Sequence, residues 1–159
     1  MLIVSDASPI IALALCNKLD LLDTLFDQIC IPKAVFNELT VSNKLKAKEI
    51  TEWAKSKITP AQNTVAITAL SLNLDPGESE AIALYLETNA DYLLIDERKG
   101  RTIAARNGIR IIGTMGVLLW AKQKGVLTVI KPTLDMLMRT DFRISDTLYH
   151  QILDRAREL

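Results

Sequence analysis

Histidine and cysteine are scarce in this sequence, and their scarcity removes several classes of enzyme. The chain has one histidine, His150, and two cysteines, Cys16 and Cys30, whose spacing matches no metal-binding motif. Because His150 lies in the last predicted helix, away from the acidic residues described below, we expect neither a histidine general base nor a nucleophilic triad. We expect Cys16 and Cys30 to be buried free thiols, which suits a reducing cytosol.

Long apolar runs and tracts of biased composition are also missing. No stretch approaches the ~20 consecutive apolar residues of a membrane span, and the opening Met-Leu-Ile-Val run is too short for a signal-peptide core. No Pro-, Gly- or Ser-rich tract suggests a linker, so the 159 residues are expected to form one domain, residues 1–159. We therefore expect a soluble, cytoplasmic protein of a single domain.

An excess of charge of one sign is absent as well. Nineteen basic side chains balance nineteen acidic ones, so the chain lacks the overall basic character that supports nucleic-acid binding by charge alone. Binding to a nucleic acid would then depend on a local basic surface or on a metal ion. Four basic residues follow Asp96 and fit either phosphate contacts or a solvated helix face; they are Arg98, Lys99, Arg101 and Arg106.

What the sequence does contain is an alternation of short apolar runs with helical patterns, which predicts an α/β fold with a mostly parallel central sheet. The predicted strands are residues 2–4, 29–31, 92–95 and 109–112, with a further edge strand at 126–130. The predicted helices are residues 10–15 after Ser8 as N-cap, 19–26, 32–39, 44–57, 76–87, 100–107, 114–125 after Thr114 as cap, 133–139 and 145–158. Residues 59–73 are expected to form a short helix or an irregular connection. The crossover between strands 92–95 and 109–112 makes these two strands parallel.

Four carboxylates stand where strands give way to helices or just inside a helix: Asp6, Glu38, Glu78 and Asp96. Asp6 and Asp96 follow strands directly, and open α/β sheets bind ligands outside the carboxyl ends of their strands. An aspartate at such a position loses solvation unless a cation compensates it. Each acid also has a structural interpretation: Asp96 as an N-cap, Glu78 as the partner of Asp75 in a capping box, and Glu38 as a solvent-facing helical residue.

A divalent metal explains four clustered carboxylates better than acid–base catalysis does, because neighbouring like charges resist joint ionisation without a counter-ion. Mg²⁺ or Mn²⁺ would supply that charge, activate a water and stabilise the transition state of phosphodiester hydrolysis. Hydrolysis of a nucleic acid is the predicted activity.

The segments around these acids resemble the PIN domain in order and spacing. The matching segments are residues 4–9 (VSDASP), 31–32 leading to Glu38-Leu39, 77–82 (GESEAI) and 94–98 (LIDER) with Gly100-Arg101. More narrowly, residues 113–118 (GTMGVL) and 141–145 (DFRIS) resemble a subgroup of VapC-like toxins. The resemblance covers nearly the whole chain.

This resemblance implies a three-layer α/β/α fold and a Mg²⁺- or Mn²⁺-dependent ribonuclease. By position, Asp6 matches the family's first acid, Glu38 its second and Asp96 its last. Glu78 stands where many members have an aspartate, and Glu80 and Glu97 are nearby acids that could share or replace its duty. The resemblance also implies an RNA substrate, a homodimer and a small antitoxin partner.

A second hypothesis is a non-catalytic module of the same fold that dimerises or binds partners. It is motivated by the zero net charge and by the altered third acid. The region around Trp53 and the last two helices are the surfaces that the sequence suggests for an interface.

Overall fold

The centre of the protein is a parallel sheet of four strands. The structure, a computed structural model, describes residues 1–41 and 44–159. The strands β1 (Leu2–Ser5), β2 (Gln28–Cys30), β3 (Tyr92–Leu94) and β4 (Ile111–Ile112) pair in the order β2-β1-β3-β4. β2 lies on one side of β1, and β3 and β4 lie on the other side, so the strand order reverses between β1 and β3. Such a reversal opens a crevice beyond the carboxyl ends of those two strands.

Side chains alternate between the two faces of the sheet and build a core on each. Val4 pairs with Cys30 and Leu93, and these residues belong to one apolar cluster. Ile3 pairs with Ile29, and both belong to the other cluster. Because successive side chains of a strand point to opposite faces, a sheet covered by helices on both sides follows. The predicted α/β/α architecture is confirmed.

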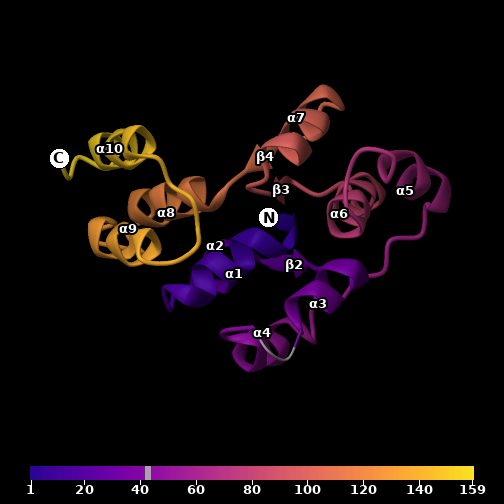
Figure 1. Cartoon of the computed structure of the whole chain (residues 1–159), viewed down its shortest axis with the longest axis horizontal. Helices are drawn as coiled ribbons and strands as arrows, with labels where there is room; N and C mark the ends of the chain where they lie inside the picture. Colours follow the sequence, from indigo (N-terminus) through magenta and orange to yellow (C-terminus); the bar gives the residue numbers. More distant parts are fainter. Residues whose placement is uncertain (42–43) are drawn as a thin grey trace.

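Helices cover both faces, and Figure 1 shows them arranged around the sheet. Residues from α1 (Ala7–Leu15), α2 (Asp20–Leu25), α3 (Lys33–Leu39), α4 (Ala47–Ala54), α8 (Thr114–Gln123), α9 (Lys131–Met138) and α10 (Asp146–Arg155) form the first core with Ile3. Residues from α6 (Pro76–Thr88) and α7 (Arg98–Arg106) form the second core with Val4. α5 (Thr64–Leu70) packs against α6, at the end of the molecule opposite α8, α9 and α10.

Three details of the sequence prediction are wrong. α1 begins at Ala7 with Asp6 as N-cap, so Ser8 is an exposed residue of the first turn and not the cap; Pro9 also fits there because that amide needs no partner. α8 has Gly113 as N-cap, and Thr114 is its first residue.

The third error is the edge strand at 126–130. The amides of Ile130 and Lys131 donate to the carboxylate of Glu158 at 2.7 and 2.8 Å, so this segment is anchored to the C-terminal residues and pairs with no strand of the described sheet. The helix predicted at residues 44–57 is shorter in the structure, where α4 covers Ala47–Ala54. Residues 42–43 lie outside the described residues.

One expectation about the rest of the chain is confirmed, since Cys16 and Cys30 are free and buried. Throughout residues 1–41 and 44–159, none of the helices has the length and apolar character needed to cross a membrane.

Candidate active site

Asp6 and Asp96 lie at the carboxyl ends of the two central strands. The amide of Asp6 donates to the carbonyl of Leu94 at 2.9 Å, so the pairing of β1 with β3 continues up to the first acid. Asp6 is the N-cap of α1, yet its carboxylate makes no capping hydrogen bond. With only 4% of its surface exposed, Asp6 is a buried carboxylate at the strand reversal that is not used to cap its own helix.

The first turn of α6 brings Glu38 next to Asp6. Gly77 lies in that turn, and a Cβ there would stand 3.2 Å from Glu38 Oε2 and 3.4 Å from Asp6 Oδ1. The two carboxylate oxygens therefore face the same small space, which exists because residue 77 has no side chain. α3 and α6 pack closely together, so Glu38, an exposed residue of α3, reaches the first turn of α6 with its carboxylate.

Glu78 serves as a capping residue and also belongs to the acidic cluster. The amide of Glu78 donates to Asp75 Oδ1 at 2.8 Å, and Glu78 Oε2 accepts from the amide of Asp75 at 3.2 Å, which completes a capping box. The cap uses one oxygen of the glutamate. The side chain is buried, and its carboxyl carbon lies 3.7 Å from the position of a Cβ at Gly100, at the start of α7.

The ionisation of Asp6 reflects this crowding. Burial raises the pKa of Asp6 from 3.8 to about 7, with smaller contributions from the negative charges of Asp75, Glu78 and Glu38, against a lowering by the amide of Ala7. Burial also raises the pKa of Glu38 and of Glu78, and the charge of Asp75 adds to both. Asp75 is thus a fourth acid of this cluster, and sequence reasoning assigned it only a capping role.

Asp96 is held in a different way from the other three predicted acids. Its Oδ1 accepts from the amide of Thr114 at 2.8 Å and its Oδ2 accepts from the Thr114 hydroxyl at 2.5 Å. Arg101 lies beside it, with its Nη1 donating to the carbonyl of Ile95 at 2.8 Å. Burial raises the pKa of Asp96, and the Thr114 hydrogen bonds and the Arg101 charge oppose that rise. Asp96 therefore caps α8 from another strand end, and its own helix α7 has Glu97 as N-cap.

The two alternative acids are separated by the structure. Glu80 Oε2 accepts from the amide of Ala34 at 2.8 Å, so this carboxylate caps the start of α3 and is engaged there. The sequence suggested that Glu80 could share or replace the duty of Glu78, and the structure instead shows it as the cap of a neighbouring helix. Glu97 is exposed, and its negative charge contributes to the raised pKa of Glu78.

The structure thus gathers Asp6, Glu38 and Glu78 with Asp75, and it places Asp96 on the adjacent strand end, turned toward Thr114. Across the described ranges, no three acidic, histidine or cysteine side chains already converge closely enough to hold an ion. Sequence reasoning missed Asp75 and Thr114 as members of the site, and it named Arg101 as a possible phosphate contact but not as the neighbour of Asp96. The capping-box pattern contained a signal for Asp75, because that motif places it in the same turn as Glu78.

The residues of the cluster nevertheless fit a hard divalent cation. Every donor is a carboxylate oxygen, which is the ligand that Mg²⁺ and Mn²⁺ prefer. Two of these oxygens, with a methyl of Val35, border the position that a Cβ at Gly77 would take. Burial and, to a smaller extent, the neighbouring negative charges raise the pKa of Asp6, and a cation at this point would favour its ionised form. The hydrogen bonds of Asp96 do not prevent ligation, since each carboxylate oxygen has a second lone pair.

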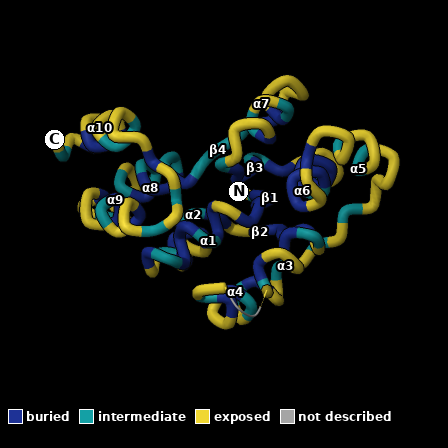
Figure 2. The backbone as a smooth tube through the Cα atoms, viewed as in Figure 1, coloured by how far each residue is buried: buried dark blue, intermediate teal, exposed yellow. Residues whose placement is uncertain are grey.

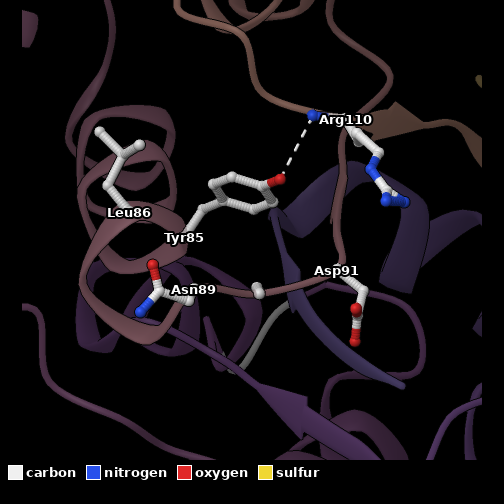
Figure 3. A pocket seen from close by; sticks show the side chains of 6 residues that line it. Tyr85, Leu86, Asn89, Asp91 and Arg110 are labelled. Atoms are coloured by element: carbon white, nitrogen blue, oxygen red, sulfur yellow. Dashed lines mark hydrogen bonds between the residues drawn. The ribbon is translucent and has the colours of Figure 1, made fainter.

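A pocket at the amino ends of the strands, away from the candidate site, contains no cluster of acidic residues (Figure 3). Asp91 and Arg110 line it just before β3 and β4 begin. Asp91 accepts from the amide of Leu2 at 2.7 Å, and the hydroxyl of Tyr85 accepts from the amide of Arg110 at 3.4 Å. These hydrogen bonds connect strands and helix at the amino ends, and the pocket has no part in the site.

Comparison with known proteins agrees with the geometry. A family model described as a PIN domain matches residues 2–158, so the chain belongs to the PIN-domain family. No curated protein and no solved structure matches the chain. Members of this family are generally nucleases, and the chain therefore has a nuclease-type fold with its acids at the edge of the sheet where such folds bind ligands.

Proposed function

We propose that this protein is a metal-dependent endoribonuclease that acts as the toxin of a type II toxin–antitoxin pair. The observation that carries the proposal is the acidic cluster at the strand reversal, in which Asp6 is buried beside other carboxylates with a pKa raised to about 7. The ionised carboxylate of Asp6 lowers the stability of the folded protein in this buried position. Residues with strongly shifted pKa values of this kind are concentrated at functional sites. RNA as the substrate and the toxin role rest on the resemblance to VapC-like toxins.

In this proposal the carboxylates of Asp6, Glu38 and Glu78 hold one or two Mg²⁺ or Mn²⁺ ions, and Asp96 contributes from the neighbouring strand end. When bound, such an ion would make a water molecule more acidic and would place positive charge near the phosphodiester. Thr114 orients Asp96 through two hydrogen bonds, and these bonds together with the charge of Arg101 favour its ionised form. Asp75 orients Glu78 through the capping box and leaves one oxygen of that glutamate available.

Cleavage of structured and unstructured RNA by the purified protein, with Mg²⁺, Mn²⁺ or chelator, tests the proposal. Asp6→Asn, Asp96→Asn and Glu78→Gln are expected to lower metal-dependent cleavage by at least about a hundredfold, as expected when a group at the reacting centre is neutralised. Glu80→Gln is the matched control. It removes an acid two positions from Glu78 on the same helix, but its carboxylate caps α3, so cleavage should persist. Equal residual activity in all of these proteins would indicate a contaminant and refute the assignment.

The toxin role has its own test in cells. Expression of the wild-type chain should arrest growth, and Asp6→Asn should relieve the arrest at equal protein level. Co-expression of a small protein encoded by a neighbouring gene should also relieve it. Efficient RNA cleavage without growth arrest would support the nuclease and refute the toxin role.

We also propose that the protein pairs with a second copy through α5. No residue of this helix is buried (Figure 2). Residues 58–74 include no charged side chain. Val65 and Leu72 are 80% and 83% exposed, and together with Thr64, Thr68 and Ala69 they line an apolar depression. An uncharged surface favours an equally uncharged partner surface, and a two-fold pair supplies the same surface twice. α5 is therefore the proposed interface, in place of the region around Trp53 or the last two helices that the sequence suggested.

Light scattering coupled to size exclusion tests this pairing. Val65→Asp and Leu72→Asp should yield a monomer, whereas Leu45→Asp, at a residue 79% exposed outside α5, should leave the mass unchanged. A wild-type protein that remains monomeric at high micromolar concentration would refute the pairing.

A further inference from the structure

A depression beside the candidate site runs along α7. It has a volume of about 430 Å³ and lies between α7 and the start of β4. Its lining, here named the α7 groove, consists of Asp96, Arg98, Arg101, Thr102, Ala105 and Ile111. Asp96 belongs both to the candidate site and to the wall of the groove, so the groove is continuous with the site. Its volume is within the range of pockets that accept small organic ligands.

The two arginines of the groove have different roles. Arg101 is engaged, since its Nη1 donates to the carbonyl of Ile95 and its charge acts on Asp96. Arg98 is exposed, and within the described part of the chain its guanidinium has no hydrogen-bond or ion-pair partner. Only its backbone carbonyl is used, by the hydroxyl of Thr102 at 3.0 Å. Arg98 is therefore a cation available to a ligand in the groove.

The other two basic residues of α7 do not line the groove. Lys99 and Arg106 are exposed on the same helix, and neither contributes to the lining. Two lining residues are apolar: exposed Ala105 on α7 and half-buried Ile111 at the start of β4 present hydrocarbon to the space. The groove thus offers a carboxylate at one end, a free guanidinium, and an apolar wall. A nucleotide has matching parts: a phosphate for a guanidinium and a ribose or base for an apolar wall.

We infer that the α7 groove binds the nucleotide adjacent to the scissile phosphodiester, with Arg98 contacting its phosphate. This inference rests on the proposed nuclease function and adds the path of the strand, which passes from Asp96 along α7 toward β4. Arg98 places a positive charge next to a site whose own charges are negative. The acidic cluster repels a polyanion, and the chain has no net positive charge to offset that repulsion. The guanidinium of Arg98 lines the same groove as Asp96, so it can hold the phosphate backbone of a strand that the acidic cluster alone would repel.

The test compares Arg98→Gln with Lys99→Gln and Arg106→Gln, all three checked for equal thermal stability. A short fluorescein-labelled single-stranded RNA is bound in EDTA over a salt series, and its Mn²⁺-dependent cleavage is measured separately. Arg98→Gln should weaken binding about tenfold and reduce the slope of log affinity against log salt by about 0.7, the value for one phosphate contact on a single strand. Lys99→Gln and Arg106→Gln should change affinity less than about twofold, because neither side chain reaches the groove.

The outcomes separate this inference from the function on which it rests. Cleavage by the wild type, with Arg98→Gln binding and cleaving like Lys99→Gln, would refute the groove and leave the nuclease intact. Binding that depends on Arg98 without any cleavage by the wild type would support the groove and refute the nuclease. Absence of both binding and cleavage would refute both. An Arg98→Lys variant that restores the salt slope but only part of the affinity would support a guanidinium–phosphate contact, since lysine keeps the charge and loses the planar pair of donors.

Discussion

Neutralising Asp6 should stabilise the metal-free protein, and only at neutral to alkaline pH. The pKa of Asp6 rises from its ordinary value of 3.8 to about 7 on folding, chiefly because the carboxyl is buried. Each pH unit of that rise corresponds to ~1.4 kcal/mol, so ionised Asp6 opposes folding by up to about 4 kcal/mol. Asp6→Asn removes this opposition. Its buried amide group needs partners that the carboxylate did not, which takes back ~1–2 kcal/mol.

The pH dependence follows from the protons that each state binds. Between pH 3.8 and about 7 the folded protein holds a proton on Asp6 that the unfolded chain has released, so stability falls as pH rises through this window. Above about pH 7 both states are ionised and the loss is complete. The advantage of Asp6→Asn should therefore be about 2 kcal/mol near pH 8 and should disappear near pH 5.

Thermal unfolding in EDTA at several pH values measures this effect. A gain of about 2 kcal/mol corresponds to ~4–8 °C in Tm for a chain of this size. Added Mn²⁺ should raise the Tm of the wild type and leave that of Asp6→Asn nearly unchanged, because binding stabilises only the form that holds the ion. Asp91→Asn is the control: this residue accepts the Leu2 amide at the other end of the sheet, and its substitution should give no alkaline gain. An Asp6→Asn protein that is less stable than wild type near pH 8, or a difference that does not vary with pH, would refute the reasoning.

Three further substitutions separate the stability of the site from its activity. Thr114→Val removes the hydroxyl that donates to Asp96, so it should lower the free energy of unfolding by ~1–2 kcal/mol and slow RNA cleavage. An unchanged free energy of unfolding in denaturant melts and an unchanged rate in single-turnover assays would contradict that role. Gly77→Ala keeps a helical backbone, so stability should change by less than ~1 kcal/mol. Its Cβ would stand 3.2 Å from Glu38 Oε2 and should weaken Mn²⁺ binding, measured by calorimetry, about tenfold or more. Equal Mn²⁺ affinity in the two proteins would show that the ion lies elsewhere. Glu80→Ala should cost about 1 kcal/mol through the lost cap of α3 without reducing the metal affinity, and a loss of metal binding would return Glu80 to the site.

The sheet and most helices were predictable because their signals are local. The runs before Asp6 and Asp96 are short and apolar, and the crossover between β3 and β4 permits only parallel pairing. Errors occurred where a distant partner decided the local structure. Residues 126–130 look like a strand, but their amides are satisfied by Glu158 from the end of the chain. Thr114 looks like a cap, but the capping oxygens come from Asp96.

The candidate site divides in the same way. Asp6 and Asp96 could be placed at the edge of the sheet because each follows a strand, and the direction of a parallel strand determines which edge its carboxyl end reaches. Glu78 and Glu80 could not be distinguished with the same certainty. Both lie in the first turns of α6, and only the packing of α6 on α3 decides that Glu80 caps Ala34 whereas Glu78 joins the acidic cluster. For the same reason Asp75 was recognised as a member of the site, and Arg101 as a charge acting on Asp96, only in the folded protein.

By itself, the sequence determined the class of fold, the family and the edge of the sheet at which the acids lie. These properties follow from apolar periodicity and from residues adjacent to strands, which neighbours in the chain control. The tertiary structure alone decided which carboxylates share a space, which are engaged as caps, and which arginine of α7 is free beside Asp96. Those properties depend on side chains that meet across long separations in sequence, where burial and charge act through distance in space and not along the chain.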